Sequence, residues 1–163
     1  MNVGNAGLKL IESFEGFVPF VYDDLRPAGG KYGYREWDGG SVKGTLTIGY
    51  GHTNAAGLPK IVKGMQVTQE EGSAILASDL HSVEVDVNRL VKVPLTQNQF
   101  DALVSFHFNT GALGKSTLLK KLNAGDYAAV PSELLKWVKS KGQTLNGLIR
   151  RRKAEGQLFM KGA

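Results

Sequence analysis

The sequence predicts an α+β protein with a small, sheet-containing lobe and a larger, mainly helical lobe. Three observations favour this class. Apolar residues alternate in two short stretches of the first third of the chain, a glycine-rich segment separates those stretches, and apolar residues recur at helical spacing after residue 68. With 163 residues and 42% hydrophobic content, the chain can bury one core, so we expect a single domain over residues 1–163.

The first expected element is a helix over residues 5–15. Asn5 can cap its N-terminus, and Gly16 stands where a C-terminal cap belongs. Glu15 is then the last helical residue, where the negative end of the helix dipole disfavours an ionised carboxylate. A carboxyl group in that position is suited to donating a proton.

Two strands of a small antiparallel sheet are expected next, over residues 17–22 and 45–50. In the second strand Thr47 faces one side and Ile48 faces the other. The segment between the strands, residues 25–44, is rich in glycine and contains a proline and scattered aromatic residues. This composition predicts a long loop or an irregular hairpin insert.

Helices are expected for almost all of the chain after Thr68. Capping boxes begin at Thr68 and at Thr96, each with a Glu or Gln three residues later. The first of these helices should run without interruption to about residue 92, because Pro94 then ends it. Three further helices are expected, over residues 116–122, 126–139 with a bend near Pro131, and 148–160.

These elements group into the lobes of one domain. We expect a β-containing lobe over residues 16–67, a connecting helix over residues 68–92, and a helical lobe formed by residues 93–163 with the helix over 5–15. Two lobes joined by a helix leave a cleft, and extended substrates usually bind in clefts.

The amino-acid composition indicates the cellular compartment in which the chain folds, and the distribution of charge indicates the class of partner. The chain has no cysteine and no stretch near the ~20 apolar residues of a membrane span, so we expect folding in a reducing cytoplasm without membrane insertion. Residues 1–110 carry nine Lys or Arg against twelve Asp or Glu, whereas residues 111–163 carry eleven against three. Such a basic half is typical of a protein with an anionic partner, namely nucleic acid, a membrane surface or bacterial cell wall, or of a basic surface without a partner.

The carboxylates near the N-terminus are the first candidates for chemistry. Asp23 and Asp24 follow the first strand, and Asp24 stands nine residues after Glu15. A glutamate at a helix end and an aspartate at a strand end can face one space, which is the two-carboxylate arrangement of glycoside hydrolysis. The three histidines lack metal-binding spacing, and the chain has neither a serine nucleophile elbow nor a phosphate-binding loop, so we expect no metal and no cofactor.

Three separated motifs carry a family resemblance. The first joins Glu15-Gly16 and Tyr22-Asp23-Asp24 to the run TIGYGH at residues 47–52, and the others are PLTQNQFDALVSFHFNTG at residues 94–111 and GLIRRRKAE at residues 147–155. In this order they resemble the phage lysozymes of glycoside hydrolase family 24, the T-even and lambdoid endolysin type. The likeness runs from residue 8 to about residue 159 and implies a lysozyme-like α+β fold.

The resemblance implies an endolysin that hydrolyses the β-1,4 bond between N-acetylmuramic acid and N-acetylglucosamine in peptidoglycan. Glu15 matches the family's general acid, while Asp24 and Thr47 match the aspartate and threonine that would position the attacking water. The family is taken to invert the anomeric carbon, which implies carboxyl groups ~6.5–9.5 Å apart. The expected partner is a peptidoglycan glycan strand, not nucleic acid, and we expect a monomer.

The same resemblance suggests binding and supporting residues. We expect the substrate site to include Gly51, His52, Phe108 and Asn109. A buried histidine bonded to Asp79 is the stronger interpretation of His52, and a helix C-cap is an equal alternative for Asn109.

An arginine of the third motif is expected to pair with Glu15 and to hold that side chain in place. The candidates are Arg150, Arg151 and Arg152, of which Arg151 is preferred.

The insert leaves the aspartate assignment open. The chain places 22 residues between Asp24 and Thr47, where the family commonly has about five. Asp23 and Asp38 are therefore alternatives to Asp24, although Tyr-x-Asp spacing favours Asp24. The insert itself is either a tolerated surface loop or a source of aromatic side chains that stack on sugar, for which the candidates are Tyr32, Tyr34 and Trp37.

Two rival functions remain alternatives to hydrolysis. A lytic transglycosylase would need only one acid and would release an anhydro sugar, and a non-catalytic cell-wall-binding protein on the same scaffold would explain the basic half. Because the sequence shows no export segment, we expect the enzyme to accumulate in the host cytoplasm and to depend on a separate holin to reach the periplasmic wall.

Overall fold

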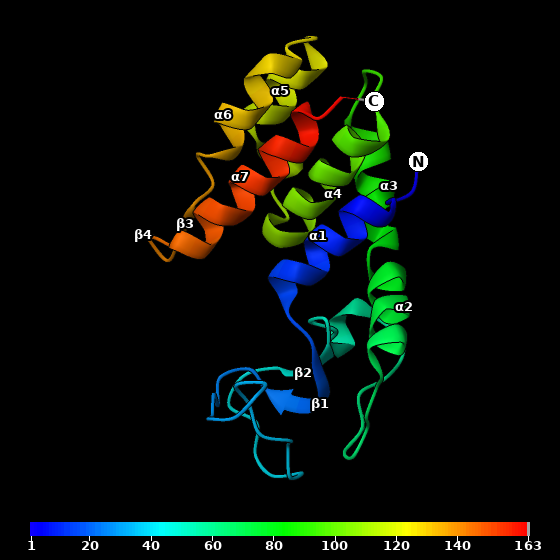
Figure 1. Cartoon of the computed structure of the whole chain (residues 1–163), viewed down its shortest axis with the longest axis vertical. Coiled ribbons are helices and arrows are strands. Elements are labelled where there is room, and N and C mark those ends of the chain that lie inside the picture. Colours follow the sequence, from blue (N-terminus) through cyan, green and yellow to red (C-terminus); the bar gives the residue numbers. More distant parts are fainter. Residues whose placement is uncertain (163) are drawn as a thin grey trace. The chain divides into compact units, whose positions relative to one another are not determined.

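The computed structural model describes residues 1–162 as two compact units. The small unit contains residues 12–79, and the helical unit contains residues 1–11 and the chain from residue 80 onward. In chain order the elements are α1 (Asn5–Glu15), β1 (Val18–Asp23), β2 (Leu46–Gly49), α2 (Gln69–Asp79), α3 (His81–Leu90), α4 (Gln97–Thr110), α5 (Thr117–Asn123), α6 (Val130–Leu134), β3 (Lys139–Ser140), β4 (Gln143–Thr144) and α7 (Asn146–Met160), with 3-10 turns at Asn54–Ala56, Leu113–Lys115 and Tyr127–Ala129 (Figure 1). Helices combined with small antiparallel sheets confirm the predicted α+β class.

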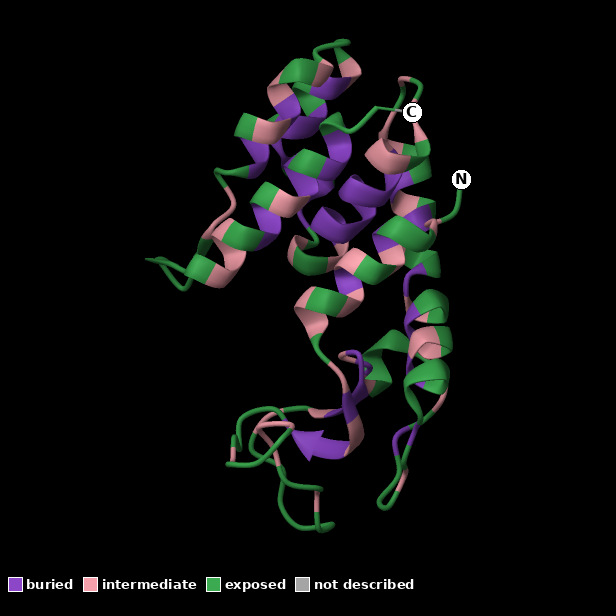
Figure 2. Ribbon diagram, in the orientation of Figure 1, coloured by how far each residue is buried: buried purple, intermediate pink, exposed green. Residues whose placement is uncertain are grey.

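The helical unit is built around α4. Every residue of this helix from Phe100 to His107 is buried, and α7 and α3 each pack against it (Figure 2). The predicted capping box is present, since Thr96 and Gln99 exchange hydrogen bonds between side chain and backbone. Gly111 ends the helix in the left-handed conformation, with φ 63°, that glycine adopts most readily.

The N-terminus of α1 is capped by a carboxylate of α4, so the expected cap by Asn5 is wrong. Asn5 is already the first helical residue, and the backbone N–H groups of Gly4 and Gly7 donate to Asp101 at 2.9 and 3.1 Å. Asp101 approaches this closely because Gly7 lacks a side chain: a Cβ there would lie 2.6 Å from the Asp101 Cβ. At the other end, the predicted cap is confirmed, since Gly16 has φ 72°.

The small unit is organised by the antiparallel pairing of β1 with β2. Tyr22 lies opposite Thr47 in this register, and the predicted division of β2 into two faces is confirmed. One face packs on a buried core of Val21, Ile48, Ile61 and Val67. The predicted capping box of α2 is also present, because Glu71 N–H donates to Thr68 Oγ1 at 3.1 Å and Thr68 N–H donates to Glu71 Oε1 at 2.9 Å.

The expected uninterrupted helix over residues 68–92 is two helices. α2 ends at Asp79 and α3 begins at His81, with the fully buried Leu80 between them. Leu80 keeps right-handed torsions, φ −74° and ψ −11°, so helical spacing of apolar residues continues across the interruption. The sequence has neither glycine nor proline at this point to mark the break.

The expected helix over residues 126–139 is also wrong, because α6 ends at Leu134. Pro131 lies in the first turn of α6, where its missing N–H costs nothing, and therefore starts a helix instead of bending one. The chain then forms the unpredicted hairpin of β3 and β4. Its two-residue turn, Lys141 and Gly142, has φ 50° and 79°, as type I′ hairpin turns require.

Removing the Asp101 carboxylate should destabilise the protein. Asp101 is 1% exposed, so Asp101→Ala leaves the N–H groups of Gly4 and Gly7 without their acceptor, at a cost of about 2 kcal/mol or more. Asp101→Asn keeps one acceptor oxygen and should lose less. Urea unfolding measures both, and Asp126→Ala, which removes an exposed carboxylate, is the control. Equal midpoints for Asp101→Ala and Asp126→Ala would contradict the capping role.

Candidate functional site

The free face of the β1–β2 ribbon gathers three polar side chains that the sequence singled out. Residues paired across strands share a face, so Tyr22 and Thr47 lie together, opposite the face of Val21 and Ile48. Asp24, the first residue after β1, is hydrogen-bonded to Thr45, the residue before β2, and its charge acts on the Tyr22 phenol. We call the face of Tyr22, Asp24 and Thr47 the site face. The strand pairing thus brings together two residues of the predicted catalytic set.

Glu15 reaches the same region of the small unit from the end of α1. A Cβ at Gly51 would lie 3.1 Å from Glu15 Oε1, so the glycine lets the backbone after β2 approach the carboxyl group. Gly51 also has φ 77°, a conformation that residues with a side chain rarely adopt. Gly51, predicted to bind substrate, is therefore placed against the predicted acid.

Tyr22 links the two predicted carboxylates and was not assigned a role from the sequence. Burial raises the pKa of the Tyr22 phenol to about 12, and the neighbouring Tyr34, Asp24 and Glu15 contribute in the same direction. Both carboxylates therefore act electrostatically on one phenol, which stays protonated at neutral pH. The Tyr-x-Asp spacing was the available signal for Tyr22, because residues two apart on a strand share a face.

Backbone groups of Thr45 hold Asp24 and Thr47. Its N–H donates to Asp24 Oδ1 at 2.7 Å, and its carbonyl oxygen accepts from Thr47 Oγ1 at 3.0 Å. With its proton committed, the Thr47 hydroxyl presents acceptor lone pairs, and Asp24 is exposed to solvent. This arrangement can accept hydrogen bonds from a water molecule and, at Asp24, can accept its proton.

Asp23 has a different task. Its carboxylate is 4% exposed and accepts hydrogen bonds from the N–H groups of Lys43 at 2.6 Å, Gly44 at 2.9 Å and Leu25 at 3.1 Å, with Arg26 at 3.3 Å. Desolvation works to raise the pKa of Asp23, but these hydrogen bonds and the Arg26 charge outweigh it and hold the pKa below its usual value. Asp23 therefore fastens both ends of the insert.

Asp38, the other alternative to Asp24, lies within the insert. Its Oδ1 accepts from the Gly40 N–H at 2.8 Å. Asp23 is committed to backbone groups, and Asp38 lies within the insert, whereas Asp24 acts on the Tyr22 phenol together with Glu15. These contacts are consistent with the preference for Asp24 over Asp23 and Asp38.

The aromatic side chains of the insert have separate partners. Tyr34 packs on Tyr22 with ring centroids 4.2 Å apart, and Tyr32 meets Phe20 edge-on at 5.8 Å. Trp37 packs against the core of the small unit, and its indole N–H donates to the Gly40 carbonyl at 3.0 Å. Of the three stacking candidates, Tyr34 is the one on the site face, whereas Trp37 anchors the insert.

His52 is a buried brace. Its Nδ1 lies 2.8 Å from Asp79 Oδ2, which confirms the predicted pair, and its Nε2 donates to the Pro59 carbonyl at 2.8 Å. Burial raises the pKa of Asp79, although His52 opposes this shift. With both ring nitrogens bonded and 1% exposure, His52 has no group left to bind substrate.

Phe108 and Asn109 belong to the helical unit, where Phe108 is half-buried and Asn109 is exposed. Asn109 Oδ1 accepts from Arg152 at 2.8 Å, so the amide nitrogen is directed away from that arginine. The alternative of Asn109 as a C-cap is wrong, because Gly111 has that position.

The arginines of the third motif differ in burial. Arg150 is exposed, whereas Arg152 is fully buried beside Glu155, with 2.7 Å between Arg152 Nε and Glu155 Oε1. Arg151 is 4% exposed and donates to the Ser105 carbonyl at 3.3 Å. The pairing of Arg151 with Glu15 stays a prediction.

Two further properties concern residues 1–162. No group of three or more His, Asp or Glu within this range could hold a metal ion. None of the helices in the same range has both the length and the apolar character to cross a membrane.

The chain is similar to known proteins over nearly its whole length. The sequence model of the family described as Phage lysozyme matches residues 12–155. The chain is 40% identical over 164 residues to an endolysin of Bacillus phage B103, covering 99% of this chain but 55% of that protein. It is 39% identical to an endolysin of Acyrthosiphon pisum secondary endosymbiont phage 1, over 98% of both chains.

Solved structures give the same result for the fold. A P22 lysozyme mutant matches with a TM-score of 0.79 at 33% identity, covering 98% of this chain and 99% of that one. The muramidase domain of SpmX from Asticaccaulis excentricus matches with a TM-score of 0.77 at 36% identity, covering 98% and 97%. The lysozyme-like fold expected from the sequence is confirmed.

Replacing Asp23 with asparagine should loosen the insert. Asparagine keeps one acceptor oxygen but loses the charge that holds the Lys43 and Gly44 N–H groups, so proteases should cut residues 25–44 faster than in the wild type. Because folding lowers the pKa of Asp23, its stabilising effect is complete above the unfolded value of about 3.9 and is lost as the pH falls through the lower folded value. The difference between the proteins should therefore shrink below about pH 4.

Asp38→Asn is the matched control, since Asp38 contacts one backbone group inside the insert. Limited proteolysis followed by mass spectrometry measures the cut sites. Equal cleavage of wild type and Asp23→Asn at neutral pH would contradict the fastening role.

Proposed function

The chain belongs to the phage lysozyme family, and from this we propose that it is an endolysin that hydrolyses the β-1,4 bond between N-acetylmuramic acid and N-acetylglucosamine in bacterial peptidoglycan. The observation that carries the proposal is the set of Glu15, Asp24 and Thr47 around Tyr22, in the small unit of a muramidase-type fold. Glycosidases of this type need two carboxyl groups with different tasks.

In the proposed reaction Glu15 is the general acid. Its proton passes to the bridging oxygen as the bond from that oxygen to the anomeric carbon breaks. A water molecule, hydrogen-bonded to Thr47 Oγ1 and Asp24, attacks the anomeric carbon from the opposite side and gives its proton to Asp24. The products are two sugar chains, one with a free reducing end. Attack by water on the opposite face would invert the anomeric configuration.

The contacts of Asp24 favour hydrolysis over transglycosylation. A transglycosylase forms an internal anhydro ring and has no water to activate, so it would gain nothing from a carboxylate and a hydroxyl held by one residue. A non-catalytic wall-binding protein would likewise have no use for this set. Both remain outcomes of the test below.

The setting of the reaction is a further part of the proposal. We expect a monomer that acts on glycan strands of the periplasmic wall after release from the host cytoplasm through a holin. The exposed cations of the helical unit suit an anionic wall.

Glu15→Gln should abolish clearing of permeabilised Gram-negative cells, with a rate at least ~100-fold lower, because glutamine cannot donate the proton. Asp24→Asn should show a comparable loss if water is activated there, and a mild one in a transglycosylase. Glu70→Gln, which neutralises an exposed carboxylate of α2, is the matched control. Turbidity measures the rates.

Mass spectrometry and NMR of the wild-type products from purified peptidoglycan decide the reaction class. Reducing N-acetylmuramic acid with inverted anomeric configuration is expected. Anhydro products would establish the transglycosylase, and binding without any product would establish the wall-binding protein. Retained turnover by Glu15→Gln would overturn the assignment of the acid.

A further inference from the structure

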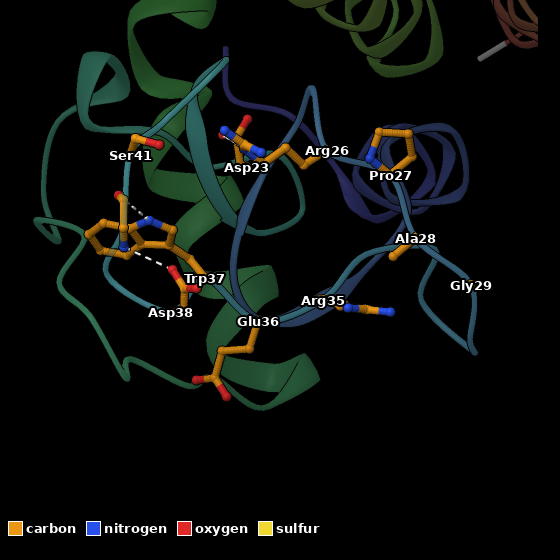
Figure 3. A pocket seen from close by; sticks show the side chains of 11 residues that line it. Asp23, Arg26, Pro27, Ala28, Gly29, Arg35, Glu36, Trp37, Asp38 and Ser41 are labelled. Carbon is orange, nitrogen blue, oxygen red and sulfur yellow. Dashed lines mark hydrogen bonds and ion pairs between the residues drawn. The ribbon is translucent and has the colours of Figure 1, made fainter.

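The insert forms a pocket that no step of the proposed reaction uses. It has a volume of about 520 Å³, and its charged and aromatic lining includes Asp23, Arg26, Arg35, Glu36, Trp37 and Asp38. Figure 3 shows Trp37 and Asp38 on one side and Pro27 and Ala28 on the other. We call it the insert pocket.

The insert pocket has fixed walls. The backbone N–H of Trp37 donates to the Val21 carbonyl of β1 at 2.7 Å, and the Trp37 side chain packs on the core of the small unit. The next turn is closed by Asp38 and the Trp37 indole, which both bond to Gly40. On the opposite wall, Pro27 pairs with Tyr34 in a bridge of the insert hairpin. The pocket is therefore a folded feature of the insert.

The charges in the insert pocket are only partly neutralised by the protein itself. Arg26 is paired with Asp23, whose carboxylate is further satisfied by backbone N–H groups. Within the described residues, Arg35 and Glu36 form no ion pair, and Asp38 uses one oxygen for the Gly40 N–H. The pocket thus presents a guanidinium together with carboxylate oxygens, which suits a ligand that carries both a carboxylate and an ammonium group.

The insert pocket adjoins the site face. Asp23 lines the pocket, and the next residue, Asp24, lies on the site face. On the other side of the insert, Tyr34 packs on Tyr22 of the site face, and the following residue, Arg35, lines the pocket. At each of these points consecutive residues of the chain therefore belong to the two surfaces.

We propose that the insert pocket binds the peptide stem of peptidoglycan, through a diamino acid whose carboxylate meets Arg35 and whose ammonium group meets Asp38. This inference rests on the proposed function, since only a muramic acid held at the site face would bring a stem to the pocket. An extended stem spans about 10 Å over three residues, which is enough to pass from one face of a strand to the other. The insert would then bind the peptide stem, while the site face binds the sugar.

The test compares two substrates that differ only in the stem. Soluble, uncrosslinked glycan strands are used intact and after an amidase has removed the stems, and kcat/KM is measured from new reducing ends. Wild type should prefer the intact strands by about tenfold, as one charge-assisted contact allows. Arg35→Ala should lose this preference through KM and keep the wild-type rate on stripped strands. Arg35→Lys should retain part of it.

Lys139→Ala is the matched control, because it removes one exposed cation from β3 in the helical unit. It should keep the full preference. If Lys139→Ala loses as much of the preference for intact strands as Arg35→Ala does, the preference reflects general attraction to an anionic strand and the inference is overturned. Equal wild-type rates on both substrates, or an equal loss on both in Arg35→Ala, would also overturn it while leaving hydrolysis intact. Failure of the wild type to cleave both substrates would instead overturn the proposed function.

Discussion

One carboxylate closes the insert and thereby sets the geometry on which the site depends. Asp23 accepts from Leu25 at the start of the insert and from Lys43 and Gly44 at its end, so β2 leaves the insert in register with β1. Lengthening a loop from about five to about twenty residues costs only about 1 kcal/mol in closure entropy. A single anchored point can offset such a cost. The ribbon therefore tolerates the insert without losing the pairing of Tyr22 with Thr47.

Two neighbouring aspartates at the end of β1 then have different tasks. Asp23 faces the insert and is consumed by backbone groups, whereas Asp24 faces the other way and stays exposed. Exchange of their tasks would require a shift of the register by one residue, which would also turn Val21 out of the core. The buried core of the small unit thus fixes the register of the ribbon, and with it the different tasks of Asp23 and Asp24.

Much of the fold and of the site was predictable because their signals are local. The capping boxes at Thr68 and Thr96, the helix end at Gly16 and the faces of β2 follow from side chains within a few residues. The cap of α1 could not be predicted, since Asp101 is distant in the chain and its approach depends on the missing side chain of Gly7. The break between α2 and α3 at Leu80 could not be predicted either, because the Leu80 torsions stay helical and no glycine or proline marks the position.

The charge of the second half of the chain shows where counting residues misleads. Arg151 and Arg152 are buried with Glu155, and desolvation raises the pKa of that glutamate although both arginines oppose the shift. Lys121 and Lys136 are both paired with the buried Glu133, at 3.1 and 2.6 Å. Four of the eleven cations therefore serve the internal structure of the helical unit. The net charge of this half already includes Glu133 and Glu155, so their pairs leave the long-range field unchanged. What the pairs change is the location of the free cations, which are the remaining exposed lysines and Arg150. Attraction of this kind brings an enzyme to an anionic wall, but selection among wall components requires fixed contacts of the kind that the insert places beside Asp24.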